Sequence, residues 1–188
     1  MKIIGGSLRG RNFHMPFGIS PTQNLVRKAV FDILGDMSGL EFLDLYAGSG
    51  AVGLEAFSRG AKRVTLVEKD LRCAAIIKEN IKLLTSIDPQ EGEMIRLIEG
   101  DALMTVKQLA QARKKFDIVF FDPPFERGLG KKTLKTLSAY DILQPNCLVI
   151  IQEHNKETLP ETEGRVRLVK AKNYGSSVIT VYQDQSEL

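Results

Sequence analysis

Short apolar segments alternate with amphipathic segments along most of the chain, and this alternation constrains the possible fold more than any other feature. The apolar segments, rich in Val, Ile, Leu and Phe, are predicted to be strands and cover residues 42–45, 63–67, 95–98, 116–121 and 147–152. The helical patterns between them cover residues 51–59, 71–84, 102–113 and 131–140. Such alternation builds βαβ units, so the sequence predicts an α/β fold with a mostly parallel sheet and helices on both faces.

The carboxyl-terminal part of the chain follows a different pattern. Residues 165–171 and 177–182 are two further strand segments, and the loop between them, residues 172–176, contains Gly and has the length of a hairpin connection. The sheet is therefore expected to finish with an antiparallel pair, which brings the total to about seven strands.

The first 38 residues are predicted to form an extension of the α/β core. Residues 2–4 and 11–15 have the pattern of a short β-hairpin, and a helix capped by Thr22 is expected to run to about Leu34. A chain of 188 residues has the length of one domain. We therefore expect a single domain over residues 1–188, in which the core spans residues 39–188.

Positive charge is concentrated in this extension. Residues 1–31 contain basic side chains and no acidic one, whereas the rest of the chain carries slightly more acidic than basic residues. The basic side chains are Lys2, Arg9, Arg11, Arg27 and Lys28. A basic patch on an otherwise balanced domain is typical of a protein that binds a polyanion such as nucleic acid. A solvated surface without acidic residues gives the same pattern, so charge alone leaves both interpretations open.

The sequence offers no signal for export, membrane insertion or metal binding. Its apolar runs are too short for a transmembrane helix, and its first residues lack the apolar core of a signal peptide. The two cysteines, Cys73 and Cys147, and the two histidines are scattered, which disfavours a disulfide framework and a zinc site. We therefore expect a cytoplasmic protein without a metal ion. A monomer is the default, because the sequence shows no exposed heptad pattern or long apolar edge.

Ligands of open α/β sheets bind beyond the carboxyl ends of the strands, which directs attention to the residues that follow each predicted strand. At the end of the first strand, Gly48, Gly50 and Gly53 fit the GxGxxG pattern of a nucleotide-binding turn, although a tight turn alone also explains them. Asp44 repels a pyrophosphate but attracts a sulfonium cation. This carboxylate favours S-adenosylmethionine over NAD as the cofactor.

Single acidic residues follow the next two predicted strands. Glu68 is placed to accept hydrogen bonds from both hydroxyls of a ribose, or else is a surface acid beside Lys69. Asp101 either accepts a hydrogen bond from an adenine amino group or caps the helix that follows it. The sequence leaves these two roles of Asp101 open with equal weight.

The most specific motif of the chain, Asp122-Pro123-Pro124-Phe125, stands at the end of the predicted strand 116–121. The exocyclic amino group of a nucleobase is a poor nucleophile because its lone pair is delocalised into the ring. Asp122 and the carbonyl of Pro123 can accept hydrogen bonds from that amine and stabilise the positive charge that develops on it. Phe125 can stack on the base. The motif therefore indicates methylation of an amine, although a stiff exit from the strand, with Phe125 in the core, is the alternative.

Together these motifs resemble the class I S-adenosylmethionine-dependent methyltransferases that methylate amino groups, and more closely the RsmD-like family. The segments that carry the closer resemblance are residues 1–6, 9–11, 21–22, 26–34, 44–53, 55–56, 58–61, 67–70 and 122–125. The resemblance implies a Rossmann-like, seven-stranded, mostly parallel sheet with a C-terminal antiparallel hairpin. It also implies methylation of the N2 amine of a guanine in 16S ribosomal RNA.

Carried over by position, the resemblance implies three sets of functional residues. The cofactor would be bound by Asp44, Ala47, Gly48, Ser49, Gly50, Glu68, Lys69, Asp101 and Ala102. The catalytic residues would be Asp122, Pro123 and Phe125. The RNA would be bound by Lys2, Arg9, Arg11, Arg27 and Lys28, with a small-subunit assembly particle as the expected partner. The chain departs from the family pattern at Ser20, Asn24, Leu25 and Lys28. These departures leave the transfer chemistry intact, but they put in question how the N-terminal helix closes over the cofactor and grips RNA.

Three other functions stay open on the sequence. The motif at residues 122–125 suits the N6 amine of adenine in DNA as well as the N2 amine of guanine, although the chain has no evident target-recognition domain. The GxGxxG pattern suits an NAD-dependent oxidoreductase, for which the carboxylate of Asp44 is awkward. A non-catalytic RNA-binding protein with a relic of the pocket would keep the fold without turnover.

Overall fold

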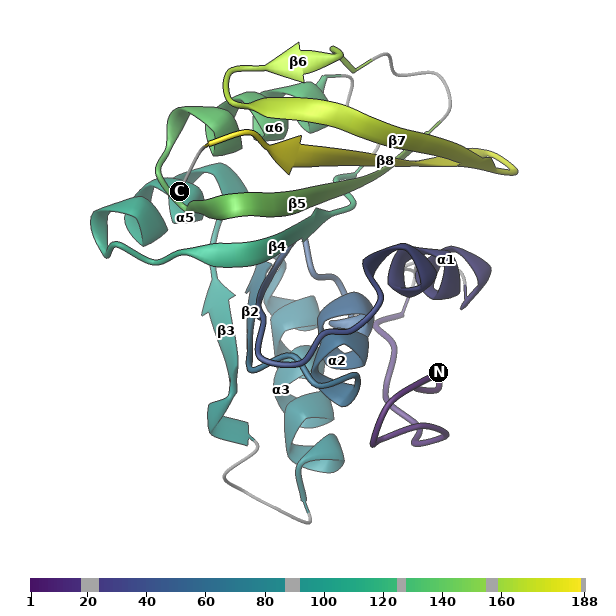
Figure 1. Cartoon of the computed structure of the whole chain (residues 1–188). Coiled ribbons are helices and arrows are strands. Elements are labelled where there is room, and N and C mark those ends of the chain that lie inside the picture. The colour runs from purple at the N-terminus through teal and green to yellow at the C-terminus, as the bar shows by residue number, and fades with distance from the viewer. Residues whose placement is uncertain (18–23, 87–91, 125–127, 155–158, 187–188) are drawn as a thin grey trace.

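The computed structural model describes residues 1–17, 24–86, 92–124, 128–154 and 159–186, which contain one eight-stranded sheet (Figure 1). In space the strands follow the order β3-β2-β1-β4-β5-β8-β7-β6. Their bounds are β1 Glu41–Leu45, β2 Arg63–Glu68, β3 Ile95–Glu99, β4 Phe116–Phe121, β5 Leu143–His154, β6 Thr162–Glu163, β7 Val166–Tyr174 and β8 Ser177–Asp184. All seven predicted strands are present, and β6 is an additional short one.

Strands β1 to β5 form the parallel half of the sheet. Most side chains of β1, β2 and β4 are buried, which explains why these strands are continuous apolar runs rather than alternating ones. Because β1 pairs with β2 on one side and with β4 on the other, the strand order reverses between β1 and β4. Open α/β sheets bind their ligands at such a switch point.

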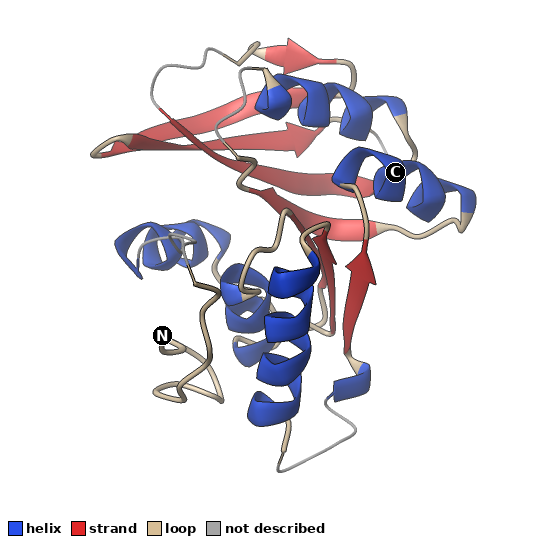
Figure 2. Cartoon of the chain, turned by 180° about the vertical axis from the view of Figure 1, so that it is seen from behind, coloured by secondary structure: helices blue, strands red, loops and turns tan. Residues whose placement is uncertain are grey.

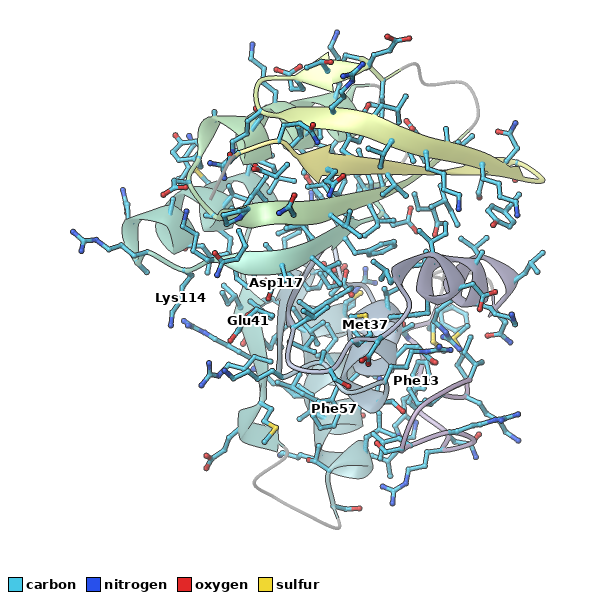
Figure 3. The ribbon with its side chains drawn as sticks, viewed as in Figure 1. Phe13, Met37, Glu41, Phe57, Lys114 and Asp117 are labelled. Atoms are coloured by element: carbon cyan, nitrogen blue, oxygen red, sulfur yellow. The ribbon has the colours of Figure 1, made fainter. Side chains whose placement is uncertain are left out.

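Helices cover both faces of the sheet, as the alternating pattern predicts (Figures 1 and 2). Their bounds are α1 Asn24–Leu34, α2 Ala51–Ser58, α3 Leu71–Leu84, α5 Ala102–Gln111 and α6 Leu129–Ala139. One core joins α1, α2, α3 and the N-terminal extension to the sheet and includes Phe13, Met37 and Phe57 (Figure 3). A second core joins α5 and α6 to the opposite face. No helix in the described part of the chain is long and apolar enough to cross a membrane.

The antiparallel half of the sheet is built on β8, which lies between β5 and β7. The loop predicted at residues 172–176 is shorter than expected, because Lys172, Asn173 and Tyr174 continue β7 and pair with β8. Gly175, with a φ of 62°, takes the left-handed conformation that the tight turn requires. The additional strand β6 pairs with the first residues of β7. Figure 1 shows the β7–β8 hairpin projecting beyond the other strands.

The start of the chain forms a minimal version of the predicted hairpin. Lys2 and Asn12 form an antiparallel bridge, which is flanked by hydrogen bonds from the amide of Ile3 to the carbonyl of Arg11 at 3.0 Å and from the amide of Phe13 to the carbonyl of Met1 at 2.9 Å. The predicted helix is present as α1, which begins at Asn24, whereas the predicted cap at Thr22 lies outside the described residues.

Residues 1–17, the first part of the N-terminal extension, are held against α2 by close backbone contacts. The amide of Ser7 donates a hydrogen bond of 2.7 Å to the carbonyl oxygen of Ser58, and the hydroxyl of Ser58 donates one of 2.6 Å to the carbonyl of Gly5. Gly6 lies so close to Ser58 that a Cβ atom would come within 1.7 Å of its carbonyl oxygen. Glycine is therefore required for this close approach.

Three charged residues, the buried Arg27 and Glu55 and the partly exposed Arg59, form a group that we call the Glu55 cluster. Arg27 and Glu55 are 0% exposed, and their Nε and Oε2 atoms are 3.6 Å apart. Arg59 Nε donates a hydrogen bond of 2.8 Å to Glu55 Oε1, and the amide of Ile4 donates one of 2.9 Å to Glu55 Oε2. Glu55 of α2 thus joins α1 and the N-terminal extension to the core.

Candidate active site

A cleft of about 520 Å³ opens at the carboxyl ends of the parallel strands, at the switch point between β1 and β4. Its walls come from the turn after β1, the ends of β2, β4 and β5, and the β7–β8 turn. The predicted site residues that line it are Asp44, Ala47, Gly48, Ser49, Glu68, Lys69, Ala102, Asp122 and Pro123. The fold therefore brings residues predicted for a cofactor and for a target base into one cavity.

The turn between β1 and α2 requires glycine for steric reasons. Gly48 and Gly50 have φ values of 57° and 79°, in the left-handed region, and Gly50 is the N-cap of α2. A Cβ atom on Gly53 would lie 2.2 Å from Leu66 Cδ2, so a larger residue would displace this buried side chain of β2. The turn therefore places the N-terminus of α2 beside the cleft, where Ala51 and Val52 line it.

Asp44 is a buried carboxylate in the penultimate position of β1. Its side chain is 1% exposed, and Oδ2 accepts a hydrogen bond of 3.0 Å from the amide of Gly53. Burial raises the pKa of Asp44 well above its usual value; the Gly53 hydrogen bond lowers it, and the charges of Asp122 and Glu68 raise it further. A pocket with several carboxylates disfavours an anionic ligand and favours a cationic one.

Glu68 ends β2 and is only 9% exposed, so it is part of the cleft wall and not a surface acid. Its Oε2 atom accepts a hydrogen bond of 2.7 Å from the amide of Gly48, and Oε1 accepts one of 2.8 Å from the amide of Asp70. Each carboxylate oxygen has a further lone pair that can accept from a hydroxyl. Glu68 therefore fixes the glycine turn and can bind a ligand at the same time. Lys69 beside it is exposed and also lines the cleft.

Asp101 has the capping role that the sequence allowed. Its side chain accepts a hydrogen bond of 3.0 Å from the amide of Met104 and begins α5. Asp101 is exposed, and its neighbours Gly100 and Ala102 line the cleft where Asp101 itself does not. A contact of Asp101 with an adenine amino group stays a prediction.

The residues after β4 lie next to those after β1 and near the end of β5. Because Phe121 pairs with Leu45 on one side and with Ile151 on the other, Asp122 follows β4 at the level of Tyr46 and Gln152. Asp122, Pro123 and Pro124 all line the cleft, with Pro123 buried. Phe125 lies outside the described residues. Hydrogen-bond acceptors for an amine therefore share the cavity with Asp44.

Tyr46 is a cleft residue that the sequence analysis passed over. Its φ of 64° lies in the left-handed region, which is uncommon for a tyrosine, and its hydroxyl forms a 2.8 Å hydrogen bond with the hydroxyl of Thr133 in α6. The sequence feature that could have identified Tyr46 is its position directly after a predicted buried strand. Gln152, Ser176 and Ser177 also line the cleft and were not predicted, because the expected site is confined to the ends of the first four predicted strands of the parallel sheet.

Asn80 connects the N-terminal extension to the glycine turn. Its Oδ1 atom accepts a hydrogen bond of 2.7 Å from the amide of His14, and Nδ2 donates to the carbonyl oxygens of His14 at 3.0 Å and Ser49 at 3.2 Å. Asn80 is 0% exposed and lies on the buried face of α3 with Ile77 and Leu84. A polar residue in that apolar stripe was the sequence signal for this connection.

The predicted RNA-binding residues divide into two groups. Lys2, Arg9 and Lys28 are exposed, and Arg11 is partly exposed with one nitrogen bonded to the carbonyl of Leu84 at 2.8 Å. For Arg27 the prediction is corrected, because its side chain is fully buried in the Glu55 cluster and cannot reach a phosphate. Its Nη2 atom instead donates a hydrogen bond of 2.6 Å to the carbonyl of Lys2.

Two of the positions that depart from the family pattern have structural roles in α1. The Oδ1 atom of Asn24 accepts a hydrogen bond of 3.1 Å from Arg27, and Lys28 forms an exposed ion pair of 2.6 Å with Asp32. Leu25 is 64% exposed, and Ser20 lies outside the described residues. Of the described positions, Asn24, Leu25 and Lys28 do not line the cleft.

Comparisons with known proteins extend over nearly the whole chain. The family model described as Conserved hypothetical protein 95 matches residues 1–183. Ribosomal RNA small subunit methyltransferase D of Escherichia coli K12 is 33% identical over 190 residues, covering 100% of this chain and 91% of that protein. The protein of the same name from Haemophilus influenzae is 33% identical over 187 residues, and this alignment covers 98% of this chain and 94% of that protein. The solved structure of Escherichia coli yhhF is 31% identical with a TM-score of 0.86, over 100% of this chain and 99% of that chain.

Proposed function

The chain belongs to the RsmD-like family of ribosomal RNA small subunit methyltransferases, and we propose that it transfers a methyl group from S-adenosylmethionine to the exocyclic N2 amine of a guanine in 16S ribosomal RNA. The observation that carries this proposal is a single cleft that joins buried Asp44 to the segment 122–124. One end of that cleft suits a cationic cofactor, and the other carries acceptors for an amine.

The residues at the first end fit S-adenosylmethionine, the cofactor of the enzyme, which supplies an electrophilic methyl group. Asp44 is buried near two other carboxylates, so a sulfonium and an ammonium group would offset its charge. Glu68 would accept hydrogen bonds from the ribose hydroxyls, and the turn at residues 47–50 would bind the remainder of the donor. Lys69, Asp101 and Ala102 would flank its adenine.

The residues at the second end would prepare the target amine. Asp122 and the carbonyl of Pro123 would each accept one N–H bond, which favours a pyramidal nitrogen and stabilises its developing positive charge. The two prolines fix φ and add no N–H donors of their own to this segment. Phe125 would stack on a base that is flipped out of the RNA.

Cofactor binding is expected to strengthen as pH rises, because of Asp44. Without a ligand, burial first and the neighbouring carboxylates next raise the pKa of Asp44 above its ordinary 3.8. The protonated carboxyl group of Asp44 therefore stabilises the fold below pH 3.8. This stabilisation is lost as the pH rises through the raised pKa of Asp44. A cation favours the ionised form, so S-adenosylmethionine affinity should rise over that same window. Calorimetric titrations at a series of pH values should show weak binding while Asp44 is protonated and tighter binding once it is ionised.

Two controls separate this effect from a general one. Asp44→Asn removes the titrating group and should give weaker binding with a flatter pH profile. S-adenosylhomocysteine has a neutral sulfur, so its affinity should depend less on pH than that of the sulfonium donor. An equally steep profile for Asp44→Asn would assign the titration to another group.

The exposed basic residues of the N-terminal extension are the proposed RNA surface. Arg9 is exposed and Arg11 partly so, and the extension is fixed to the cleft through Asn80. Arg9→Ala combined with Arg11→Ala is expected to weaken RNA binding and to flatten its salt dependence by about two phosphate contacts. Filter binding at several salt concentrations measures both quantities.

The matched control for this pair is Arg113→Ala combined with Lys114→Ala. These two residues are exposed and precede β4, so they lie at the amino-terminal end of that strand, away from the cleft at the carboxyl ends. Figure 3 shows Lys114 far from Phe13 of the extension. The control should keep the wild-type salt slope. If the slope of the Arg9 and Arg11 variant is also unchanged, the RNA surface lies elsewhere, for instance at Arg167, Lys170 and Lys172 of β7.

The expected partner is a small-subunit assembly particle, and we place the enzyme in the cytoplasm as a monomer. The deciding experiment maps methylated nucleosides by mass spectrometry in ribosomal RNA from cells with and without this protein. Loss of one N2-methylguanine supports the proposal. Loss of N6-methyladenine would assign the enzyme to the other amine, and an unchanged methylation map would overturn the proposed function.

A further inference from the structure

Gln152, near the carboxyl end of β5, lines the cleft. Its Oε1 atom is buried and has no hydrogen-bond partner among the described residues. A buried acceptor without a partner is unfavourable and is uncommon in folded proteins. Gln152 is therefore suited to a partner that arrives with a ligand.

The register of the sheet places Gln152 beside the reacting end of the cleft. Phe121 of β4 pairs with Ile151 of β5, so Asp122 and Gln152 are the next residues on two adjacent parallel strands. Neighbouring strands lie about 4.8 Å apart, a distance that two side chains binding one ring can span. Side chains alternate along a strand, so Gln152 and Ile150 point to the same face of the sheet. Ile150 pairs with Phe120 of β4, so Gln152 shares this face with Phe120, and Phe120 also lines the cleft.

Gln152 also lies on the side of Asp122 that is away from the cofactor residues. Across the sheet, Glu68 belongs to β2, Asp44 to β1, Asp122 follows β4, and Gln152 belongs to β5. The cleft wall beyond Gln152 is made by Ser176 and Ser177 of the β7–β8 turn. These small polar side chains leave room for a planar ring and can hydrogen-bond to it.

We propose that Gln152, with Ser176 and Ser177, forms a nucleobase subsite that reads the Watson–Crick edge of the purine whose amine is held by Asp122. This inference rests on the proposed function and specifies the residue that recognises the base. Flipped bases are generally read by hydrogen bonds to this edge. In guanine the N1–H donor stands next to the N2 amine, and Gln152 Oε1 accepts from it.

The chemistry of N1 makes this contact a test of base identity. Guanine presents an N1–H donor, whereas N1 is an unprotonated acceptor in both adenine and 2-aminopurine. 2-Aminopurine keeps the amine at C2, so it isolates the N1 contact from the reacting group. A carboxamide can rotate to present its NH₂ group, so Gln152 tolerates an acceptor in part. A carboxylate at this position accepts only, and an aliphatic side chain makes neither bond.

The experiment compares methyl transfer to guanine and to 2-aminopurine at the mapped position of small-subunit RNA, free or reconstituted with its proteins. The variants are Gln152→Leu, Gln152→Glu and, as a control, Gln108→Leu at an exposed position of α5. We expect Gln152→Leu to lower the kcat/KM preference for guanine over 2-aminopurine about tenfold, the effect of one lost base contact. Gln152→Glu should keep or increase the preference, and Gln108→Leu should keep it.

Two binding measurements provide a readout besides turnover. The dissociation constant of S-adenosylhomocysteine should stay within about twofold of wild type in Gln152→Leu, since the residue lies outside the cofactor end. Guanine-containing RNA should bind Gln152→Leu more weakly than wild type, and the loss should be smaller for 2-aminopurine RNA. An unchanged guanine preference in Gln152→Leu, or an equal loss for both bases, would overturn the subsite.

Failure of the proposed function has a different signature. A wild-type enzyme that methylates neither base at any RNA position would overturn the proposed activity, and the subsite with it. A wild-type enzyme that methylates guanine while all Gln152 variants keep its preference would leave the activity intact and refute only the subsite.

Discussion

Replacement of Asp122 by alanine is expected to lower kcat for methyl transfer about 10²- to 10³-fold, which is the usual loss when one preorganised charge-stabilising group is removed. Asp122 lines the cleft directly after β4, beside buried Pro123. Its carboxylate is proposed to hold the amine and to offset the charge that develops on nitrogen. Because Asp122 is not expected to hold the cofactor, the dissociation constant of S-adenosylhomocysteine should change only a few-fold. Single-turnover kinetics with saturating RNA measures the chemical step.

Two further variants test whether the loss of activity comes from the acceptor oxygen of Asp122. Asp122→Asn keeps an acceptor oxygen in the same place and should retain more activity than Asp122→Ala. Glu93→Ala removes an exposed acid before β3 that does not line the cleft, so it should leave both the stability and kcat near wild type. Wild-type turnover in Asp122→Ala would remove Asp122 from the catalytic residues.

Replacement of Glu55 by alanine is expected to lower the free energy of unfolding by about 3–5 kcal/mol, because it leaves a buried charge without its partner. Arg27 is 0% exposed, and Glu55 is the acidic side chain of its cluster. Burial lowers the pKa of Arg27, Glu55 raises it, and Arg59 lowers it. Without Glu55 the two guanidinium groups repel each other, and the amide of Ile4 loses its acceptor. Urea unfolding followed by circular dichroism measures the change.

The matched control is Glu79→Ala, at an exposed position of α3, which should stay within about 0.5 kcal/mol of wild type. A second variant removes both charges, Arg27→Met with Glu55→Gln. It should recover part of the loss, since no unpaired charge stays buried. A Glu55→Ala protein within about 1 kcal/mol of wild type would show that water reaches the cluster.

The strands of the parallel half could be predicted because each contains a short apolar run, and most side chains of β1, β2 and β4 are buried. Irregular features could not. β5 begins at Leu143, earlier than the predicted residue 147, and its register with β4 shifts between Phe116 and Ile118. Asn146, with a φ of 64°, lies in this irregular part. The two residues of β6 have no apolar pattern at all, and their pairing depends on the turn at Gly164, with a φ of 56°.

The candidate site could be predicted where chemistry and position coincide in the chain. Asp44, Glu68 and Asp122 stand at strand ends, and the topology rule places strand ends together. Contacts between segments that are far apart in the sequence could not be predicted. The charge of Arg27 suggested RNA, but its burial depends on Glu55, which is distant in sequence. Gln152 shows no motif, and its relation to Asp122 appears only once β4 and β5 are paired.

The position of β8 has a consequence for how the protein is made. β7 precedes β8 in the chain, yet it reaches the sheet only through β8, which pairs with β5 on its other side. During translation, β6 and β7 therefore emerge before the strand that docks them, and β5 keeps an open edge until β8 follows. An unpaired edge of this kind is prone to associate with other nascent chains. The Ser176–Ser177 wall of the cleft is also set only at that late moment, so a stalled polypeptide would have a glycine turn but no completed cavity.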